Sequence, residues 1–365
     1  MPENCDEIQY WSSRLINDAA LTETPLYLVV SDVALVVRSN SNNLLAKLKH
    51  YFSHIVVAGC EPTIEVIAIE QPAPELNIDF FDWRREPGKT GRKDSYFDIP
   101  GGRLLRKVRT GMVFLQCEGP RIAAGPCTQN DNQVINFINA QFANAFQQQG
   151  ALTCHAAGVV KNDQGFAVAG FSGGGKSTLM LHLLEHDHIK YLTNDRLYIR
   201  KQGNGVSANS IPKLPRVNPG TIVHNPRLQS LLSAARREQL LALPQAALWE
   251  LEEKYDVFID DLYGKDRIQM QAPLSGFLVL NWQRDSEHDL QVARVDLEER
   301  RDLLAAIMKS PGPFYQRSDG SLYQDSLTLD EQAYLEVLRP IPIYEASGRV
   351  DFTALAEICV NELMA

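Results

Sequence analysis

The stretch GFSGGGKSTLM, residues 170–180, has three consecutive glycines, a lysine and two hydroxyl side chains that run directly into apolar residues. From Gly170 to Ser177 it matches the spacing G-x-x-x-x-G-K-[ST] in full. The same letters occur in phosphate-binding loops and in flexible glycine-rich linkers. The segments on either side distinguish the two.

Both neighbouring segments favour a phosphate-binding loop. GFAVAG, residues 165–170, predicts a short buried strand. STLMLHLLEH, residues 177–186, predicts a helix with one apolar side, formed by Leu179, Met180, Leu183 and Leu184. The glycines therefore fall in a strand-to-helix turn, where such a loop belongs.

The residue types in this turn suit a nucleoside triphosphate. Glycines let backbone N–H groups approach phosphate oxygens, and the helix N-terminus adds partial positive charge. We expect Lys176 to reach the β- and γ-phosphates and Ser177 to place its hydroxyl on Mg²⁺. As an exposed loop residue, Lys176 should be replaceable by alanine without loss of the fold. The expected ATP-binding residues are Gly170, Phe171, Ser172, Gly173, Gly174, Gly175, Lys176, Ser177 and Thr178.

A histidine upstream is expected beside this loop. Two apolar segments flank the turn at residues 161–164, and a four-residue hairpin loop there pairs Val160 with Gly165. The same register brings His155 opposite Gly170. His155 would then donate a hydrogen bond to phosphate or tune a neighbouring acid. The alternative is a structural histidine bonded to the backbone.

An aspartate downstream is the expected carboxylate of the site. In YLTNDRLYIR, residues 191–200, a strand is interrupted by Asn194, Asp195 and Arg196. Such a position returns to the ligand edge of an α/β sheet, where Asp195 would bind Mg²⁺ or take a proton from an attacking hydroxyl. The alternative is a turn aspartate. The later strand over 276–282, where an acid is common in nucleoside triphosphatases, carries Asn281 instead.

Composition bounds the class of protein. The 365 residues are 44% hydrophobic, which predicts a globular chain of about two domains. The net charge of −9 argues against nonspecific nucleic-acid binding. There is no signal peptide or membrane-spanning run, and the six cysteines show no disulfide or zinc spacing, so we expect a cytoplasmic protein that binds neither membrane nor nucleic acid.

The pattern before the glycines predicts a separate N-terminal α/β domain over residues 1–130, followed by a P-loop domain over 131–365. Two strands are expected within 26–39, a helix over 42–52, and another helix over 132–149. A polar loop over 82–95 carries a basic cluster, which either docks an acidic partner or phosphate or is a solvated mobile loop: Arg84, Arg85, Lys89, Arg92 and Lys93.

The histidine in CHAAG, the G-x-S-G-x-G-K-S loop and the NDR segment, in this order, resemble the catalytic domain of HPr kinase/phosphorylase. IPKLPRVNPGT, residues 211–221, and KSPGPFY, residues 309–315, resemble the HPr kinase-related kinase B subgroup. The core resemblance covers about residues 150–225. It implies a P-loop kinase domain with a mixed sheet of the HPr kinase/PEP carboxykinase type, and transfer of phosphate from ATP to a serine hydroxyl.

The resemblance also implies roles for residues. His155 matches the active-site histidine, and Asp195 matches the aspartate that acts as base in phosphorylation and as acid in the reverse reaction. Asn194 stands where the family has a first aspartate, which puts the reverse, phosphorylase reaction in doubt. Arg216 either contacts phosphate or substrate or is a surface arginine.

No clear copy of the family's segment with a metal-binding glutamate is found. Glu250, Glu252 and Glu253 are candidates for that second carboxylate or form a solvated acidic helix face.

Together these features predict an ATP- and Mg²⁺-dependent kinase, with Asp195, His155 and Lys176 as catalytic residues and Ser177 and Asp195 as metal ligands. The expected acceptor is a hydroxyl, most simply a serine of a protein or peptide. A nucleotide-binding switch without phosphoryl transfer and a small-molecule hydroxyl kinase stay open. So does the oligomeric state, a homo-oligomer included.

Overall fold

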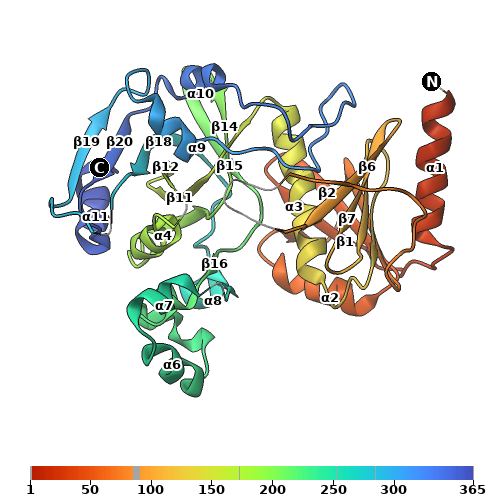
Figure 1. Ribbon diagram of the computed structural model, residues 1–365, viewed down its shortest axis with the longest axis horizontal. Coiled ribbons are helices and arrows are strands. Elements are labelled where there is room, and N and C mark those ends of the chain that lie inside the picture. Colours follow the sequence, from red (N-terminus) through yellow and green to blue (C-terminus); the bar gives the residue numbers. More distant parts are fainter. Residues whose placement is uncertain (1, 85–90, 172, 252, 284, 365) are drawn as a thin grey trace. The chain divides into compact units, whose positions relative to one another are not determined.

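The computed structural model describes residues 2–84, 91–171, 173–251, 253–283 and 285–364. By compactness the chain divides into two units, drawn in Figure 1. Unit 1 comprises Met1–Gly150 and Ser310–Thr328, and unit 2 comprises Ala151–Lys309 and Leu329–Ala365. Each unit has its own sheet and is described by itself.

Unit 1 is a mixed α/β layer structure. Its elements are α1 (Pro2–Ile16), β1 (Leu26–Val30), β2 (Val33–Ser39), α2 (Asn42–Tyr51), β3 (Val56–Val57), β4 (Ile64–Glu70), β5 (Phe81–Asp82), β6 (Asp94–Ile99), β7 (Gly102–Lys107), β8 (Val113–Cys117), β9 (Arg121–Gly125) and α3 (Asp131–Gln148). The strands form a nine-stranded sheet in the order β3-β1-β2-β4-β9-β8-β7-β6-β5. The β2–β4 and β4–β9 pairs are parallel, and the others are antiparallel.

Helices cover both faces of this sheet. Trp11 and Leu15 of α1 pack in one apolar cluster with strand residues such as Leu115. On the opposite face, the ring of Phe137 in α3 lies 5.0 Å from that of Phe114. The alternation of buried side chains along β8 therefore supplies both interfaces.

A late segment of the chain, residues 310–328, packs into unit 1. The buried Arg103 side chain holds it, because its Nη1 donates to the carbonyl oxygens of Pro313 and Tyr323 at 3.0 and 2.9 Å. The predicted domains, 1–130 and 131–365, differ from the two compact units in the placement of this segment and of α3. The division into domains that fold independently stays a prediction.

Unit 2 carries the glycine-rich motif. Its elements are β10 (Leu152–Cys154), β11 (Ala156–Lys161), β12 (Gln164–Gly170), α4 (Lys176–Leu184), β13 (Ile189–Thr193), β14 (Leu197–Gln202), β15 (Gly205–Ser210), β16 (Arg216–Val217), α5 (Pro219–Ile222), η1 (Pro226–Leu231), α6 (Ala234–Leu241), α7 (Gln245–Glu250), β17 (Tyr255–Asp256), α8 (Ile259–Leu262), β18 (Gln271–Leu280), β19 (Gln291–Val295), η2 (Arg301–Leu303), α9 (Leu304–Ile307), α10 (Glu331–Leu338), β20 (Ile343–Ser347), α11 (Phe352–Ile358) and η3 (Cys359–Leu363).

The main sheet of unit 2 is also mixed and nine-stranded. Its order is β10-β14-β15-β18-β12-β11-β13, with β20 pairing to both β18 and β19. The β12–β18 and β18–β20 pairs are parallel. The α/β class and the mixed sheet expected from the sequence are therefore observed.

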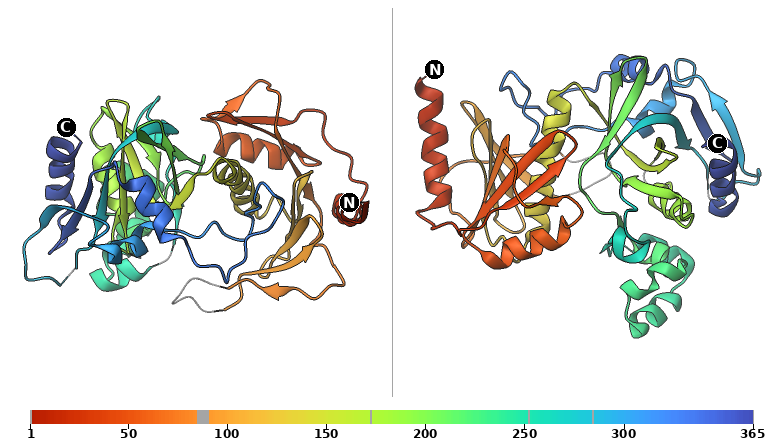
Figure 2. Two further views of the ribbon diagram at one scale, coloured as in Figure 1. Left: turned by 90° about the horizontal axis from the view of Figure 1, so that it is seen from above. Right: turned by 180° about the vertical axis from the view of Figure 1, so that it is seen from behind.

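Helices enclose this sheet in two apolar layers, so β12 is buried on both faces. Phe166 and Val168 pack in the cluster that contains α4 and α11. Ala167 and Ala169 pack in the cluster that contains α9 and α10. This explains why GFAVAG is apolar throughout rather than alternating. Figures 1 and 2 show these helices on the two sides of the sheet, and α5–α8 as a helical extension that packs beside α4.

Several expected elements are confirmed. Both strands within 26–39, the helix after them, and the helix over 132–149 are present as β1, β2, α2 and α3. The expected loop over 82–95 is shorter than predicted, because its ends belong to β5 and β6. Arg85 and Lys89 of the basic cluster lie outside the described residues. Arg92 forms an ion pair with Asp82 at 2.8 Å.

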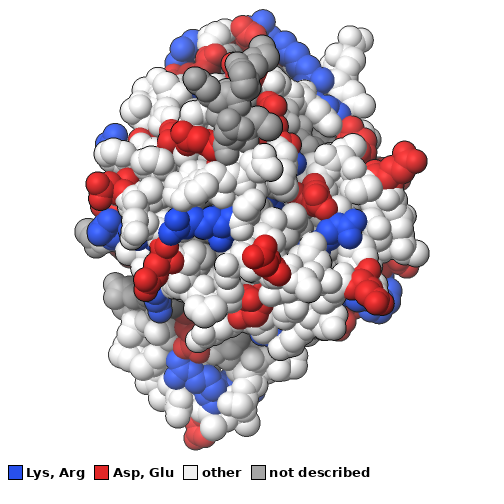
Figure 3. Space-filling view, turned by 90° about the vertical axis from the view of Figure 1, so that its right-hand side faces the viewer, with Lys and Arg blue, Asp and Glu red and all other residues white. Residues whose placement is uncertain are grey.

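Charge is mixed on the face of the molecule shown in Figure 3, where basic side chains are interspersed with acidic ones. In the part of the chain that the structure describes, no helix combines the length and the hydropathy needed to cross a membrane.

Candidate functional site

The glycine motif forms a turn between β12 and α4. Gly170 ends the strand, and Lys176 begins the helix. Gly173 and Gly175 have φ angles of +76° and +89°, which L-residues with a side chain rarely adopt. At Gly175 a Cβ atom would also lie 2.5 Å from Cζ of Phe352, so only glycine fits there. Ser172 lies outside the described residues.

The first turn of α4 carries Lys176, Ser177 and Thr178. No side chain of the described residues caps this helix, because Gly175 stands at the N-cap. The hydroxyl of Thr178 lies 3.2 Å from that of Thr221 in α5, whereas Ser177 is half-buried. Backbone amides and the helix dipole at this end are suited to an anion.

Lys176 is not the exposed loop lysine that the sequence predicted. Its side chain is only 9% exposed, and Nζ donates to the carbonyl oxygen of Gly170 at 2.8 Å. The helix begins at this residue, so the side chain runs back beneath the turn rather than into solvent. Burial lowers the pKa of Lys176 to about 8, although the carboxylate of Asp195 acts in the opposite direction. Alanine at this position would therefore leave a cavity.

The predicted hairpin register is confirmed. Val160 pairs with Gly165, and the same register continues to Ala156 and Ala169. His155 stands one residue before β11, and its backbone N–H donates to Ile307 at 2.7 Å. Since β13 is antiparallel to β11 as β12 is, the ends of β12 and β13 flank the start of β11. The glycine turn, His155 and the NDR segment therefore share one edge of the sheet.

Asp195 lies at this edge among cationic side chains. Nζ of Lys309 donates to its Oδ1 at 3.1 Å, and Nζ of Lys213 is 3.6 Å from its Oδ2. Nε2 of His155 is 3.5 Å from Oδ1, and Nε of Arg196 is 4.0 Å from Oδ2. The Asp195 side chain is nevertheless 35% exposed, so solvent reaches the cluster.

The charges set the protonation of the two titratable candidates. Burial by itself would raise the pKa of Asp195, but the cations of Lys309, Lys213 and Arg196 hold it well below its usual range. The pKa of His155 falls to about 4 because the ring is desolvated and lies near Lys309 and Lys176. At neutral pH the site therefore contains an ionised Asp195 and a neutral His155.

Sequence reasoning missed Lys213 and Lys309, although both lie in segments that carry the subgroup resemblance. Tyr191 on β13 holds Lys213, because its hydroxyl donates to the Lys213 carbonyl at 2.6 Å. The N–H of Lys309 donates to the carbonyl of Thr153 at 3.1 Å, next to an antiparallel bridge between Cys154 and Met308. The proline and glycine residues in NPGT and SPGPF predict turns, but nothing in these patterns assigns a function to the preceding lysines.

The other basic and acidic candidates have partners elsewhere. Arg216 lies on β16, and its Nε is 3.0 Å from Asp256 on the paired strand β17. Glu253 bonds to Arg236 and to the Tyr255 hydroxyl. Glu252 and the side chain of Glu250 lie outside the described residues. The contacts of Arg216 and Glu253 thus do not join them to the Asp195 cluster.

Asparagines occupy two positions at which an acidic side chain is common in related sites, one before Asp195 and one after β18. Asn281 directly follows β18, and its Nδ2 donates to Oε1 of Glu345 at 2.7 Å. Oδ1 of Asn194 is buried and has no hydrogen-bond partner among the described residues. An unpaired buried acceptor beside Asp195 is costly unless a ligand or water satisfies it.

Aromatic side chains support the glycine turn. Nε1 of Trp282 donates to the Gly174 carbonyl at 2.9 Å. Its ring meets Phe352 edge-to-face, with centroids 5.0 Å apart, and Phe352 stacks on His182 of α4. The turn is therefore held from both α4 and the first residue of α11.

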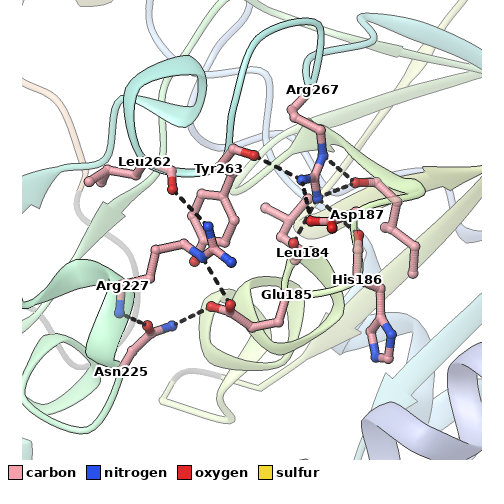
Figure 4. Close-up of polar contacts among 10 residues, drawn as sticks. Leu184, Glu185, His186, Asp187, Asn225, Arg227, Leu262, Tyr263 and Arg267 are labelled. Atoms are coloured by element: carbon pink, nitrogen blue, oxygen red, sulfur yellow. Dashed lines mark hydrogen bonds and ion pairs between the residues drawn. The ribbon is translucent and has the colours of Figure 1, made fainter.

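The far end of α4 is anchored by Arg267, as Figure 4 shows. Its guanidinium donates to the carbonyls of Leu184, His186 and Ile189 at 2.7–3.0 Å, and to Tyr263 at 2.9 Å. Arginine thus satisfies carbonyls that a helix leaves unpaired at its end.

Comparisons with solved structures find similar chains, of which one is described here. No protein-family model matches the sequence, and the comparison with curated proteins finds no match. The Hpr(Ser) kinase/phosphatase from Coxiella burnetii is similar in structure, at 11% sequence identity and a TM-score of 0.30. The similarity covers 57% of this chain and 93% of that chain. A likeness at this level carries no argument about the residues of the site, so membership in that family stays a prediction.

Proposed function

We propose that this protein is an ATP-dependent kinase that transfers the γ-phosphate to a hydroxyl, most simply a serine of a protein or peptide. One observation carries the proposal: a solvent-accessible carboxylate, Asp195, lies among cations at the sheet edge that also holds the glycine turn. Such a site combines a place for a polyphosphate with a group that accepts a proton.

Nucleotide binding falls to the turn and α4. The two positive-φ glycines turn the backbone so that amides of the first helical turn face the triphosphate. Lys176, already directed along the turn toward Gly170, exchanges that carbonyl for phosphate oxygens. The surplus of positive charge around Asp195 attracts an anion over several ångströms.

The residues present also fit Mg²⁺ brought in with the nucleotide. Magnesium at such sites takes one or two protein oxygens and completes its shell with phosphate and water. Ser177 and Asp195 are the donors proposed from the sequence, and the unpaired Oδ1 of Asn194 is a third oxygen of the right kind. When bound, the ion neutralises charge on the β- and γ-phosphates.

In the transfer step the acceptor oxygen bonds to the γ-phosphorus as the bond to the β–γ bridging oxygen breaks. Asp195 accepts the hydrogen bond from the acceptor hydroxyl and then its proton, and ADP leaves with the bridging oxygen. Neutral His155, 3.5 Å from Asp195, orients the hydroxyl or a phosphate oxygen without adding charge. The chemistry thus depends on position and electrostatics.

One observation favours a nucleotide-binding switch as a second candidate. The pKa of Asp195 lies well below its usual range, which makes it a weak base in the free protein. In that case ATP binds at the turn, no phosphate is transferred, and a partner distinguishes the bound nucleotide.

Phosphoryl transfer separates the two candidates. γ-Labelled ATP is incubated with the protein and a lysate of the source cells, and label is sought in proteins and in small molecules. The wild type should label a protein, and Lys176→Met, which keeps most of the side-chain volume, should not. Tight ATP binding without labelling of any acceptor would support the switch. Label only in small molecules would identify a small-molecule kinase.

A further inference from the structure

The charges around Asp195 are unbalanced. Lys213, Lys309 and Arg196 all lie within 4.0 Å of one carboxylate, and Lys176 interacts with it electrostatically. Four cations against one anion leave three positive charges. A surplus of three positive charges beside a glycine turn is typical of sites that bind an anion.

We infer that Lys213 and Lys309 are ligands of the terminal phosphoryl group of the nucleotide, and that Asp195 occupies them until that group arrives. This inference rests on the proposed nucleotide-binding function and names which lysines complete it. In the free protein the Asp195 carboxylate stands in for phosphate. When the nucleotide binds, the two lysines exchange the carboxylate for phosphate oxygens. The carboxylate oxygens can then accept a hydrogen bond from the acceptor hydroxyl.

Both lysines are anchored at the backbone, and their ammonium groups pair with the Asp195 carboxylate. The carbonyl of Lys213 accepts from Tyr191, and the N–H of Lys309 donates to Thr153. Their side chains are 29% and 14% exposed, so the ammonium groups reach a solvent-accessible space. A lysine side chain has four rotatable bonds, so its ammonium group can move a few ångströms without movement of the backbone.

The terminal phosphate is the expected partner because of where Asp195 must act. A base that takes the proton of the attacking hydroxyl lies beside the oxygen that joins the γ-phosphorus. Groups 3.1 and 3.6 Å from that base are then within reach of γ-phosphate oxygens. Lys176, bonded to Gly170 in the turn, stays assigned to the β- and γ-phosphates.

If the two lysines bind the terminal phosphate, they should contribute to the binding of ATP more than to the binding of ADP. ATP and ADP affinities are measured by calorimetry without Mg²⁺ for the wild type, Lys213→Gln and Lys309→Gln. Each substitution should weaken ATP binding roughly 10- to 100-fold, the value of one charge-assisted hydrogen bond, and ADP binding much less. Lys201→Gln is the matched control, because Lys201 is an exposed lysine on β14, and it should bind both nucleotides as the wild type does.

Asp195→Asn provides an independent readout. If Asp195 competes with phosphate for the lysines, its neutralisation should tighten metal-free ATP binding about tenfold. The double variant with Asp195→Asn and Lys309→Gln decides between the two roles of the lysine. If Lys309 only balances the charge of Asp195, the double variant should bind ATP as tightly as Asp195→Asn. If Lys309 is a phosphate ligand, the double variant should bind ATP more weakly than Asp195→Asn.

The outcomes separate the two levels of the proposal. A wild type that binds no ATP would overturn both. Wild-type ATP and ADP affinities in Lys213→Gln and Lys309→Gln would overturn the lysine assignment and leave nucleotide binding in place. If one lysine variant does not fold, as judged by circular dichroism, unchanged or weaker metal-free ATP binding by Asp195→Asn would still count against the inference.

Discussion

The ammonium group of Lys309 lies 3.1 Å from the carboxylate of Asp195, although 114 positions separate the two residues in the sequence. The pairing depends on the strand-like run of residues 307–309 beside residues 153–155, which brings the end of α9 to the start of β11. The site is thus assembled from turns after β13, β15 and α9 around the glycine turn. The charged residues of the site therefore come from separate segments that the fold brings together, and no single sequence motif contains them all.

Asp195→Asn should lower turnover about 10²- to 10⁴-fold, the usual contribution of a positioned base. The reason is that asparagine keeps the shape but cannot take the proton of the acceptor. Metal-free ATP binding should not be lost, since Lys176 and the turn amides are unchanged, and it should tighten about tenfold because the lysines no longer pair with a carboxylate. Single-turnover transfer from labelled ATP measures the effect. Full activity would place the base elsewhere, and loss of binding only in the presence of Mg²⁺ would make Asp195 chiefly a metal ligand.

Gly175→Ala should destabilise unit 2 by roughly 2–5 kcal/mol. A φ of +89° costs about 1–2 kcal/mol for a residue with a Cβ, and the contact with Phe352 adds an overpacking cost of about 1–3 kcal/mol. Gly203→Ala is the control, because its φ is +57° and nothing lies within 4 Å of the added carbon. Urea unfolding should show the smaller, conformational cost alone for Gly203→Ala. Equal costs would mean that Phe352 moves aside freely.

Local patterns predicted the frame of the site correctly. The strand before the glycines, the helix after them and the hairpin register need only neighbours in sequence, because alternation, apolar spacing and turn length are local properties. The position of Asp195 after β13 followed from the same logic. His155 was expected at this edge and is 3.5 Å from Asp195.

Long-range packing decided what the sequence did not reveal. Contacts with Tyr191 and Thr153 hold Lys213 and Lys309 at the site, and no local sequence pattern encodes these contacts. Arg216, three residues after Lys213, was considered as a phosphate or substrate contact or as a surface arginine, and it pairs with Asp256. The burial of Lys176 was also missed, since it depends on how the glycine turn folds over the lysine stem.

The affinity for ATP should fall above pH 8. Burial lowers the pKa of Lys176 to about 8, so the free protein carries this charge below that pH and loses it above. Bound phosphate restores the proton, which makes the dissociation constant rise by up to about tenfold per pH unit until the pKa of the complex is reached. Lys176→Arg keeps its charge at every pH tested.

In calorimetric titrations from pH 7.5 to 9.5, Lys176→Arg should therefore show a flatter pH profile than the wild type, whatever its absolute affinity. Any slope left in Lys176→Arg is expected from Lys213, whose pKa burial also lowers. Parallel profiles for the two proteins would show that Lys176 does not titrate in this range.

Arg267→Met should be among the most destabilising single substitutions in unit 2. The side chain is 9% exposed and donates to four carbonyl oxygens around the end of α4, seen in Figure 4. Methionine fills a similar volume but leaves those acceptors without a donor, at about 1–3 kcal/mol each where water does not reach them. Partial hydration reduces the sum, and we expect a loss of roughly 3–5 kcal/mol.

Arg227→Met is the matched control for this substitution. Arg227 belongs to the same group of polar contacts and pairs with Glu185 at 2.9 Å, but its side chain is 37% exposed. An exposed pair contributes about 0–1 kcal/mol, and its contact with the Tyr263 ring adds little at this exposure. Urea unfolding followed by circular dichroism should therefore separate the two variants by at least about 2 kcal/mol. Similar losses would mean that water replaces Arg267 at the end of α4, and that the helix which carries Lys176 and Ser177 is held by its apolar face alone.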